Sequence, residues 1–157
     1  MSGPFLKLHH VCVVVQDIDA TQRFYESVGI GPWHDYPPLE GFTELDVPDA
    51  DGFRELLYRY AWIGDVQIQL CQPGPAPTPQ REFLDSRGEG VFHVGFDVPD
   101  GDAGDRDAEA HGLEILMRGR RPDGSGFTYF DTADQAGVVL EIRQSPPAGV
   151  EQPPRPE

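Results

Sequence analysis

Two stretches of the 157-residue chain show the same pattern of apolar and polar positions. One begins near residue 8 and the other near residue 91, and both are rich in β-branched and aromatic residues, which is typical of strands. A helix-like stretch follows each of them. Further strand-like runs occupy residues 53–63 and 66–72 in the first part, and 113–119, 127–132 and 137–143 in the second. The pattern therefore predicts two units of the order β-α-β-β-β.

The two units are also similar residue by residue. The segment HVCVVVQDIDATQRFYESVGI, which starts at His10, aligns without a gap with HVGFDVPDGDAGDRDAEAHGL, which starts at His93. The alignment pairs Val11 with Val94, Val15 with Val98, Asp17 with Asp100, Asp19 with Asp102, Ala20 with Ala103, Arg23 with Arg106, and Gly29 with Gly112. Agreement at so many positions indicates an internal duplication.

This repeat divides the chain into four parts. We expect a first βαβββ module over 1–73, a linker with a short helix over 74–90, a second βαβββ module over 91–144, and a flexible proline-rich tail over 145–157. Two such modules make an α+β fold.

The first helix has recognisable ends and one apolar stripe. Asp17 or Asp19 can cap its N-terminus, and Gly29 can end it in a left-handed conformation. Phe24 and Val28 lie four residues apart, so we expect them to form the apolar stripe of this helix.

The matched histidines should lie on sheet faces that point away from the helices, because side chains alternate across a strand. In the first strand the valines face opposite to His10, and we expect them under the helix. In the second strand, opposite to His93, the apolar face consists of Phe92, Val94, Phe96 and Val98. In the last strand of each module, Gln69 and Glu141 occupy equivalent places.

Imidazole, amide and carboxylate groups from matched positions suggest a site for one divalent metal, held by His10, Gln69, His93 and Glu141. The alternative is that both histidines are hydrogen-bonded core residues and that the other two side chains face solvent. Because one duplication relates all four positions, we favour the metal site. The remaining histidines, His9, His34 and His111, have no partner in the repeat and are interpreted as surface or packing residues.

Charge and composition exclude several classes of partner. The chain has 12 basic and 27 acidic residues, a net charge of −15, so nucleic acids and anionic membrane surfaces should be repelled. No apolar run approaches the roughly 20 residues of a membrane helix, and the N-terminus does not resemble a secretion signal, so we expect a cytoplasmic protein. Cys12 and Cys71 lie in strand-like runs, which indicates buried, reduced thiols.

From about Leu6 to Arg143 the sequence resembles the vicinal-oxygen-chelate superfamily of glyoxalases, bleomycin resistance proteins and dioxygenases. The motifs are LHHVCVVVQDIDATQRFYESVGI, VQIQLCQP, FLDSRGEGVFHVGFDV and GVVLEIRQ, and they are most similar to methylmalonyl-CoA epimerase. The resemblance implies a cupped mixed sheet around one divalent ion, Co, Mn, Ni, Zn or Fe. The ligands that it implies fall on the same four residues, His10, Gln69, His93 and Glu141.

The resemblance also implies an activity. An isomerase or epimerase of this kind moves a proton next to a carbonyl through a metal-stabilised enolate, on methylmalonyl-CoA or a related small keto compound. Glu141 is one acid/base candidate. The run GFRE resembles a strand that carries an acid/base glutamate, which would assign that role to Glu55. We expect a carbonyl or acyl-CoA substrate and a homodimer.

Parts of the chain depart from the family pattern, and other functions stay open. Residues 34–53 do not resemble the family, and Phe92 replaces a histidine. The basic cluster 118–121 could meet the phosphates of CoA or form a solvated turn. His10, His93 and Glu141 alone would suit an Fe(II)-dependent dioxygenase. The fold also occurs in metal-free binding and resistance proteins.

Overall fold

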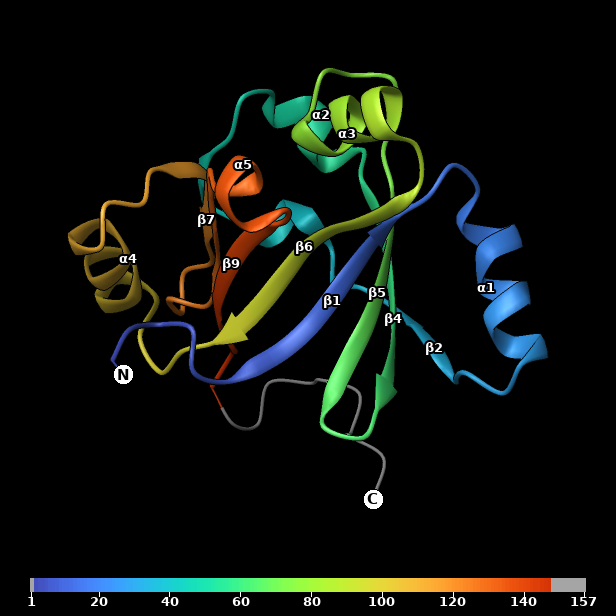
Figure 1. The fold of residues 1–157 in the computed structure, drawn as a ribbon, viewed down its shortest axis with the longest axis horizontal. Coiled ribbons are helices and arrows are strands. Elements are labelled where there is room, and N and C mark those ends of the chain that lie inside the picture. Colours follow the sequence, from blue (N-terminus) through green and yellow to red (C-terminus); the bar gives the residue numbers. More distant parts are fainter. Residues whose placement is uncertain (1, 148–157) are drawn as a thin grey trace.

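Nine strands form one curved mixed sheet, with helices lying at its ends and along its outer side (Figure 1). The structure is a computed structural model and describes residues 2–147. Most of the predicted tail, 148–157, lies outside the described residues. The spatial order of the strands is β2-β4-β5-β1-β6-β9-β8-β7-β3.

The sheet consists of two related halves. The first contains β1 (Leu8–Val14), α1 (Ile18–Ser27), β2 (Trp33–Asp35), β4 (Leu57–Ile63) and β5 (Val66–Gln72). The second contains β6 (Gly90–Asp97), α4 (Gly101–Ala110), β7 (Ile115–Arg120), β8 (Gly126–Phe130), α5 (Ala133–Ala136) and β9 (Val139–Gln144). In each half the first strand lies parallel to the last, and the halves join where β1 and β6 pair antiparallel. The predicted fold of two βαβββ modules is therefore confirmed, and the modules pair within one chain.

Two segments stand outside this duplicated framework. One carries a 3-10 turn, η1 (Leu39–Gly41), the short strand β3 (Glu44–Asp46) and the helix α2 (Ala50–Arg54). Although it belongs to the first half of the sequence, β3 pairs with β7 at the far edge of the second half. The other segment carries α3 (Pro79–Arg87) between the halves. The first of these segments thus links the two halves across the concave side.

Equivalent aspartates begin the two repeated helices. The side chain of Asp17 accepts a hydrogen bond from the backbone of Ala20 at 2.9 Å, and Asp100 accepts one from Ala103 at 3.0 Å. Asp17 is therefore the cap of α1, one of the two predicted candidates. After each helix a glycine has positive φ, +88° at Gly29 and +85° at Gly112, which removes the steric cost of the left-handed end.

The predicted apolar stripe of α1 is wrong. Phe24 and Val28 are 64% and 58% exposed, whereas Ile18 and Tyr25 pack against Leu70, Val13 and Val15. Residues 18 and 25 are seven apart, two helical turns, and so lie on one side of the helix. Because Phe24 is about 100° away from Tyr25 around the axis, only one of the two rings can face the sheet.

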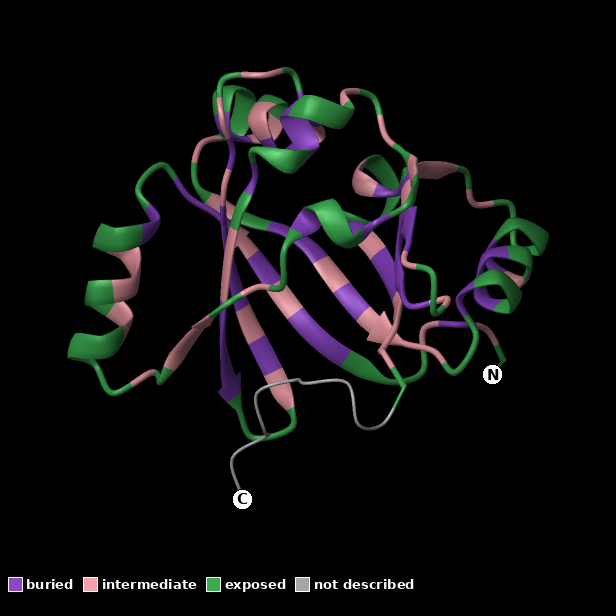
Figure 2. Cartoon of the chain, turned by 180° about the vertical axis from the view of Figure 1, so that it is seen from behind, coloured by how far each residue is buried: buried purple, intermediate pink, exposed green. Residues whose placement is uncertain are grey.

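Burial alternates along the central strands, as Figure 2 shows, but the pairing of β1 with β6 contains two irregularities. One places an extra residue, Phe92, on β6, and the other places His9 on β1. At such a bulge the alternation shifts by one residue. Phe92 therefore packs with Cys12 and Val14 on the concave side, and its predicted place on the helix-covered face is wrong.

Two smaller predictions can be compared directly with the structure. Cys12 and Cys71 are both buried and unlinked, as expected. Within residues 2–147, no helix is long and apolar enough to cross a membrane.

Candidate metal centre

Three potential ligand atoms from three adjacent strands meet on the concave side of the sheet. His10 Nε2 lies 2.9 Å from His93 Nε2 and 2.9 Å from Glu141 Oε2, and His93 Nε2 lies 2.8 Å from the same oxygen. The strands are β1, β6 and β9, and each of the three residues is at most 4% exposed. This trio of His10, His93 and Glu141 can hold a metal ion.

The spacing of these atoms fits one divalent ion. Such ions lie about 2.0–2.2 Å from nitrogen and oxygen donors, so donors at right angles are about 3 Å apart and tetrahedral donors about 3.4 Å apart. The observed separations of 2.8–2.9 Å match the right-angle arrangement. Three donors at right angles occupy one side of an ion and leave further positions for other ligands.

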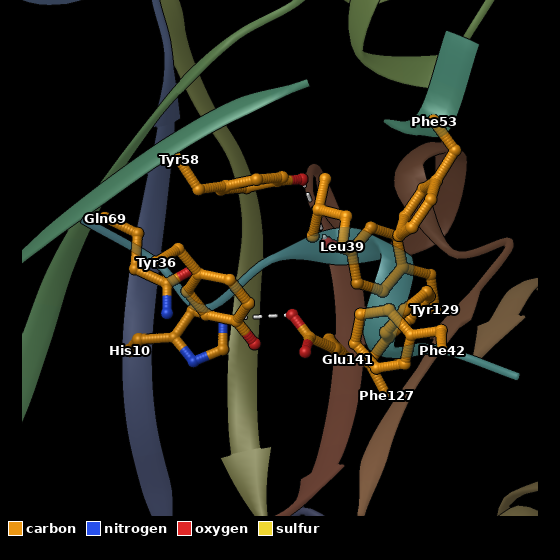
Figure 3. Close-up of a pocket in the computed structure, with 10 residues that line it drawn as sticks. All are labelled: His10, Tyr36, Leu39, Phe42, Phe53, Tyr58, Gln69, Phe127, Tyr129 and Glu141. Carbon is orange, nitrogen blue, oxygen red and sulfur yellow. Dashed lines mark hydrogen bonds and ion pairs between the residues drawn. The ribbon is translucent and has the colours of Figure 1, made fainter. Parts of the chain in front are cut away.

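Gln69, the fourth predicted ligand, lies beside the trio. Figure 3 shows its amide end next to the imidazole of His10. The amide nitrogen donates a hydrogen bond to Gln67 at 2.9 Å, so the carbonyl oxygen is the atom that remains for a metal. Both glutamines are buried on β5 and face the concave side, which is the alternation expected from the sequence.

The imidazole of His10 occupies space that only a glycine can leave open. Gly95 lies directly opposite His10 in the pairing of β1 with β6. A Cβ atom on residue 95 would overlap the ring of His10. Close packing of this kind fixes the ring, because a side chain that fills a gap of its own size has few other rotamers.

His9 supports the site, contrary to its interpretation as an ordinary packing residue. It is 3% exposed, its Nδ1 lies 2.8 Å from Nδ1 of His10, and its Nε2 lies beside the guanidinium of Arg143. Neighbouring residues of a regular strand point to opposite faces, but the bulge at His9 brings the two rings together. Hydrogen bonds to the second ring nitrogen orient metal-binding histidines.

The protonation of the site suits a metal. Burial lowers the pKa of His10 below its ordinary 6.5, against the opposing effect of Glu141. Burial raises the pKa of the Glu141 carboxyl, but the charges and hydrogen bonds of His10 and His93 outweigh it and hold that pKa well below the usual range. At neutral pH the carboxylate is ionised and His10 is uncharged, which is the state that binds a metal.

A cavity opens beside the donors, and its other walls are aromatic (Figure 3). Its lining consists of His10, Tyr36, Leu39, Phe42, Phe53, Tyr58, Gln69, Phe127, Tyr129 and Glu141. The hydroxyl groups of Tyr58 and Tyr129 are 3.4 Å apart, and Gln80 donates to Tyr58 at 3.1 Å. The sequence analysis did not identify these tyrosines. In β4, Tyr58 pairs with Cys71 and Tyr60 pairs with Gln69, so both tyrosines lie on the same face of the sheet as Gln69.

Glu55, the second predicted acid/base residue, lies outside this cavity. The predicted strand over 53–56 is wrong, because Asp49 caps the helix α2, accepting from Gly52 at 2.7 Å, and Glu55 ends that helix. The side chain of Glu55 is exposed and lies beside Gly74. Among residues 2–147, Glu141 is the only carboxylate that lines the cavity. The catalytic role of Glu55 stays a prediction.

Comparisons with known proteins agree with this fold. The family described as Glyoxalase/Bleomycin resistance protein/Dioxygenase superfamily matches residues 9–130. No curated protein matches the sequence. Many solved structures, however, share the fold, and three of them illustrate the similarity.

The methylmalonyl-CoA epimerase of Mycobacterium tuberculosis is 22% identical, with a TM-score of 0.68 over 94% of this chain and 93% of that chain. A methylmalonyl-CoA epimerase in complex with methylmalonyl-CoA and NH4+ is 25% identical, with a TM-score of 0.68 over 95% and 99%. A hypothetical protein from Bacillus halodurans is 17% identical, with a TM-score of 0.67 over 92% and 98%.

Proposed function

The chain belongs to the glyoxalase/bleomycin resistance protein/dioxygenase superfamily, and from this we propose that it is a metal-dependent enzyme that moves a proton on a carbon next to a carbonyl. The observation that carries the proposal is the convergence of His10, His93 and Glu141 to within 2.9 Å of one another, with Gln69 beside them. Imidazole and carboxylate donors that converge this closely can bind one shared cation.

The four side chains would hold one divalent ion, and Co, Mn, Ni, Zn and Fe all accept such a mixed nitrogen and oxygen set. When bound, the ion would polarise a carbonyl and stabilise the enolate that forms when the neighbouring proton leaves. The solved epimerase complex with methylmalonyl-CoA holds a substrate suited to this chemistry.

The residues of the cavity provide groups that accept and hold protons. Glu141 is ionised and is our candidate for the group that removes the proton. Burial raises the pKa of Tyr58 and of Tyr129, so their hydroxyls stay protonated at neutral pH and can donate to the substrate oxygen. The aromatic walls exclude water from the reacting carbon.

Glu55 is our alternative proton acceptor. Its carboxylate lies beside Gly74 rather than in the cavity, so this role requires the segment that carries α2 to move. Exchange that survives Glu55→Gln but is lost in Glu141→Gln, with the metal content of the wild type in both variants, would assign the proton transfer to Glu141. The reverse result would assign it to Glu55.

The proposal is tested by proton exchange without oxygen. The protein is purified, its metal content is measured, and the metal-loaded form is incubated in D₂O with methylmalonyl-CoA and with small α-hydroxy ketones while NMR follows the α-proton. We expect one ion per chain and loss of the α-proton signal for at least one substrate. Protein that binds an ion but exchanges no α-proton in any of them would contradict the proposal.

A second candidate is an Fe(II)-dependent dioxygenase. It is favoured by a specific observation: two histidines and one carboxylate form the trio, and no second carboxylate among the described residues lines the cavity. Oxygen uptake that requires ferrous ion, together with no α-proton exchange under anaerobic conditions, would select this function. Protein that takes up no metal at all would instead favour a binding or resistance protein of the same fold.

A further inference from the structure

The wall of the cavity opposite the metal donors is built from three phenylalanines that pack on one another. The ring centroids of Phe42 and Phe53 are 6.0 Å apart, those of Phe42 and Phe127 are 5.1 Å apart, and Phe53 stacks on Phe127 at 5.4 Å. All three rings are at most 7% exposed, and Leu39 extends the wall. The cavity is therefore polar on the side of the donors and apolar on the other (Figure 3).

Most of this wall comes from the part of the chain that departs from the family pattern. Leu39 and Phe42 lie in and directly after η1, and Phe53 lies in α2. These three residues fall within 34–53, and all of that stretch except the end of β2 lies outside the duplicated framework. The duplicated framework supplies the donors, whereas this inserted segment supplies the surface that a substrate would meet beyond its reacting carbon.

Two of the three arginines in the basic cluster 118–121 form ion pairs with aspartates of α4. Arg120 is 4% exposed and binds Asp105 at 2.8 Å, and Arg118 binds Asp102 at 2.5 Å and Asp105 at 2.9 Å. The basic cluster is thus neither a phosphate site nor a solvated turn but an ion-pair network under α4.

Arg121 is the remaining cation of this cluster. Its guanidinium stacks over the ring of Phe42 at 4.0 Å. Among residues 2–147, no lysine or arginine lines the cavity. With a net charge of −15, the protein offers a phosphorylated substrate little attraction near the site.

We infer that the substrate is a small, unphosphorylated carbonyl compound with an aromatic or branched apolar group, and that residues 39–53 select it. Its oxygens would face His10, Gln69 and Glu141, and its apolar group would lie against Phe42, Phe53 and Phe127. This inference rests on the proposed function, since it concerns the same site. It differs from that function in excluding CoA thioesters.

The inference is tested with two ligands that share one metal-binding head. Benzohydroxamate and acetohydroxamate chelate metals through the same two oxygens, and they differ only in a phenyl or a methyl group. We expect calorimetry on the zinc-loaded protein to show benzohydroxamate binding roughly tenfold or more tightly, because the phenyl ring is buried against the wall. Free CoA should give no saturable binding. Equal affinities for the two hydroxamates, or tight binding of CoA, would overturn the inference.

Substitutions in the phenylalanine wall test whether this wall causes the preference for benzohydroxamate. Phe53→Leu and Phe42→Leu each remove part of the apolar surface and should reduce the ratio of the two affinities several-fold, because benzohydroxamate binding weakens more than acetohydroxamate binding. Phe24→Leu on the exposed face of α1 is the matched control and should leave the ratio as in the wild type. An unchanged ratio in both wall variants, with native circular dichroism and metal content, would overturn the assignment. If neither variant folds, the hydroxamate pair on the wild type decides alone.

Proton exchange separates failure of the inference from failure of the proposed function. Exchange of the α-proton of 2-hydroxyacetophenone in preference to hydroxyacetone, with none in methylmalonyl-CoA, would support both. Exchange in methylmalonyl-CoA alone would support the function and overturn the inference. Tight benzohydroxamate binding without any α-proton exchange would overturn the function and support only the preference of the wall for an apolar ligand.

Discussion

The two modules place their candidate ligand atoms in the same way but support them differently. The first module contributes His10 and Gln69, and the second contributes His93 and Glu141, in each case from the first and last strands. His10 is held by His9 and fits over Gly95, whereas Nδ1 of His93 has no hydrogen-bond partner among the described residues. The two modules therefore share the geometry of these side chains and differ in the groups that surround each of them.

The helices of the two modules also differ in how closely they pack against the sheet. Helix α1 turns Phe24 and Val28 outward, whereas α4 packs closely, with Gly104 against Ile142 and Asp105 bound to a buried arginine. The second module thus has the more completely packed helix, and the first has the more completely supported histidine. Four predictions test these differences, beginning with the largest expected effect.

The equivalence of the two histidines is tested by removing each in turn. We expect His10→Ala and His93→Ala to weaken metal binding equally, each by more than the roughly 100-fold loss that is typical for a supporting residue. The measurement is competition with a metal-sensitive dye. His34→Ala, at the sheet edge, is the control. A large loss in only one of the two variants would show that the modules do not share one ion.

The contact between the modules is tested at Gly95. Gly95→Ala places a methyl group in the position of the His10 ring, so we expect about 1–3 kcal/mol of lost stability in urea, together with weakened metal binding. Gly90→Ala is a matched control on the same strand, since a Cβ there would approach only Phe83, at 3.9 Å. Wild-type stability and metal affinity in Gly95→Ala would contradict the described packing.

The unequal support of the histidines is tested at His9. We expect His9→Phe to lower metal affinity about 10- to 100-fold, because the ring of His10 loses its hydrogen bond while the packing volume is kept. His111→Phe, on the exposed end of α4, should leave the affinity unchanged. If His9→Phe binds metal as the wild type does, the first module has no such support.

The burial of His10 predicts a pH dependence of the metal-free protein. Burial lowers the pKa of His10 in the folded state below 6.5, so below that pH the unfolded chain binds more protons and the free energy of unfolding falls. The lowered pKa of Glu141 adds a further loss below 4.5. Urea unfolding at about pH 7.5 and about pH 5.5 should show the loss, and His10→Asn should reduce it. Equal stability at both pH values would contradict this protonation state.

Much of the donor set could be predicted from the sequence, because the repeat places His10 and His93 at the same position of two strands. The residues that pack around these donors could not be predicted from the sequence. Bulges at His9 and Phe92 shift the alternation by one residue, and nothing in the residue pattern marks them. The direction in which α1 faces depends on whether Phe24 or Tyr25 fits the sheet, which only packing decides.

The aromatic wall could not be predicted from the sequence for a different reason. Residues 34–53 lack periodicity, and their short strand pairs with β7, which is distant in the sequence. Contacts of that kind depend on the assembled sheet and not on local pattern. Local pattern also misplaces Glu55. A short motif predicts that this residue lies in a strand, whereas it lies at the end of a helix capped by Asp49.

The central claim is that both modules bind one ion through His10 and His93, and imidazole ¹⁵N NMR during a zinc titration tests it most directly. We predict that one equivalent of zinc shifts the Nε2 resonances of His10 and His93 together and leaves those of His34 and His111 in place. Shifts confined to the exposed histidines, or no shift at His10 and His93 after one equivalent, would contradict the claim.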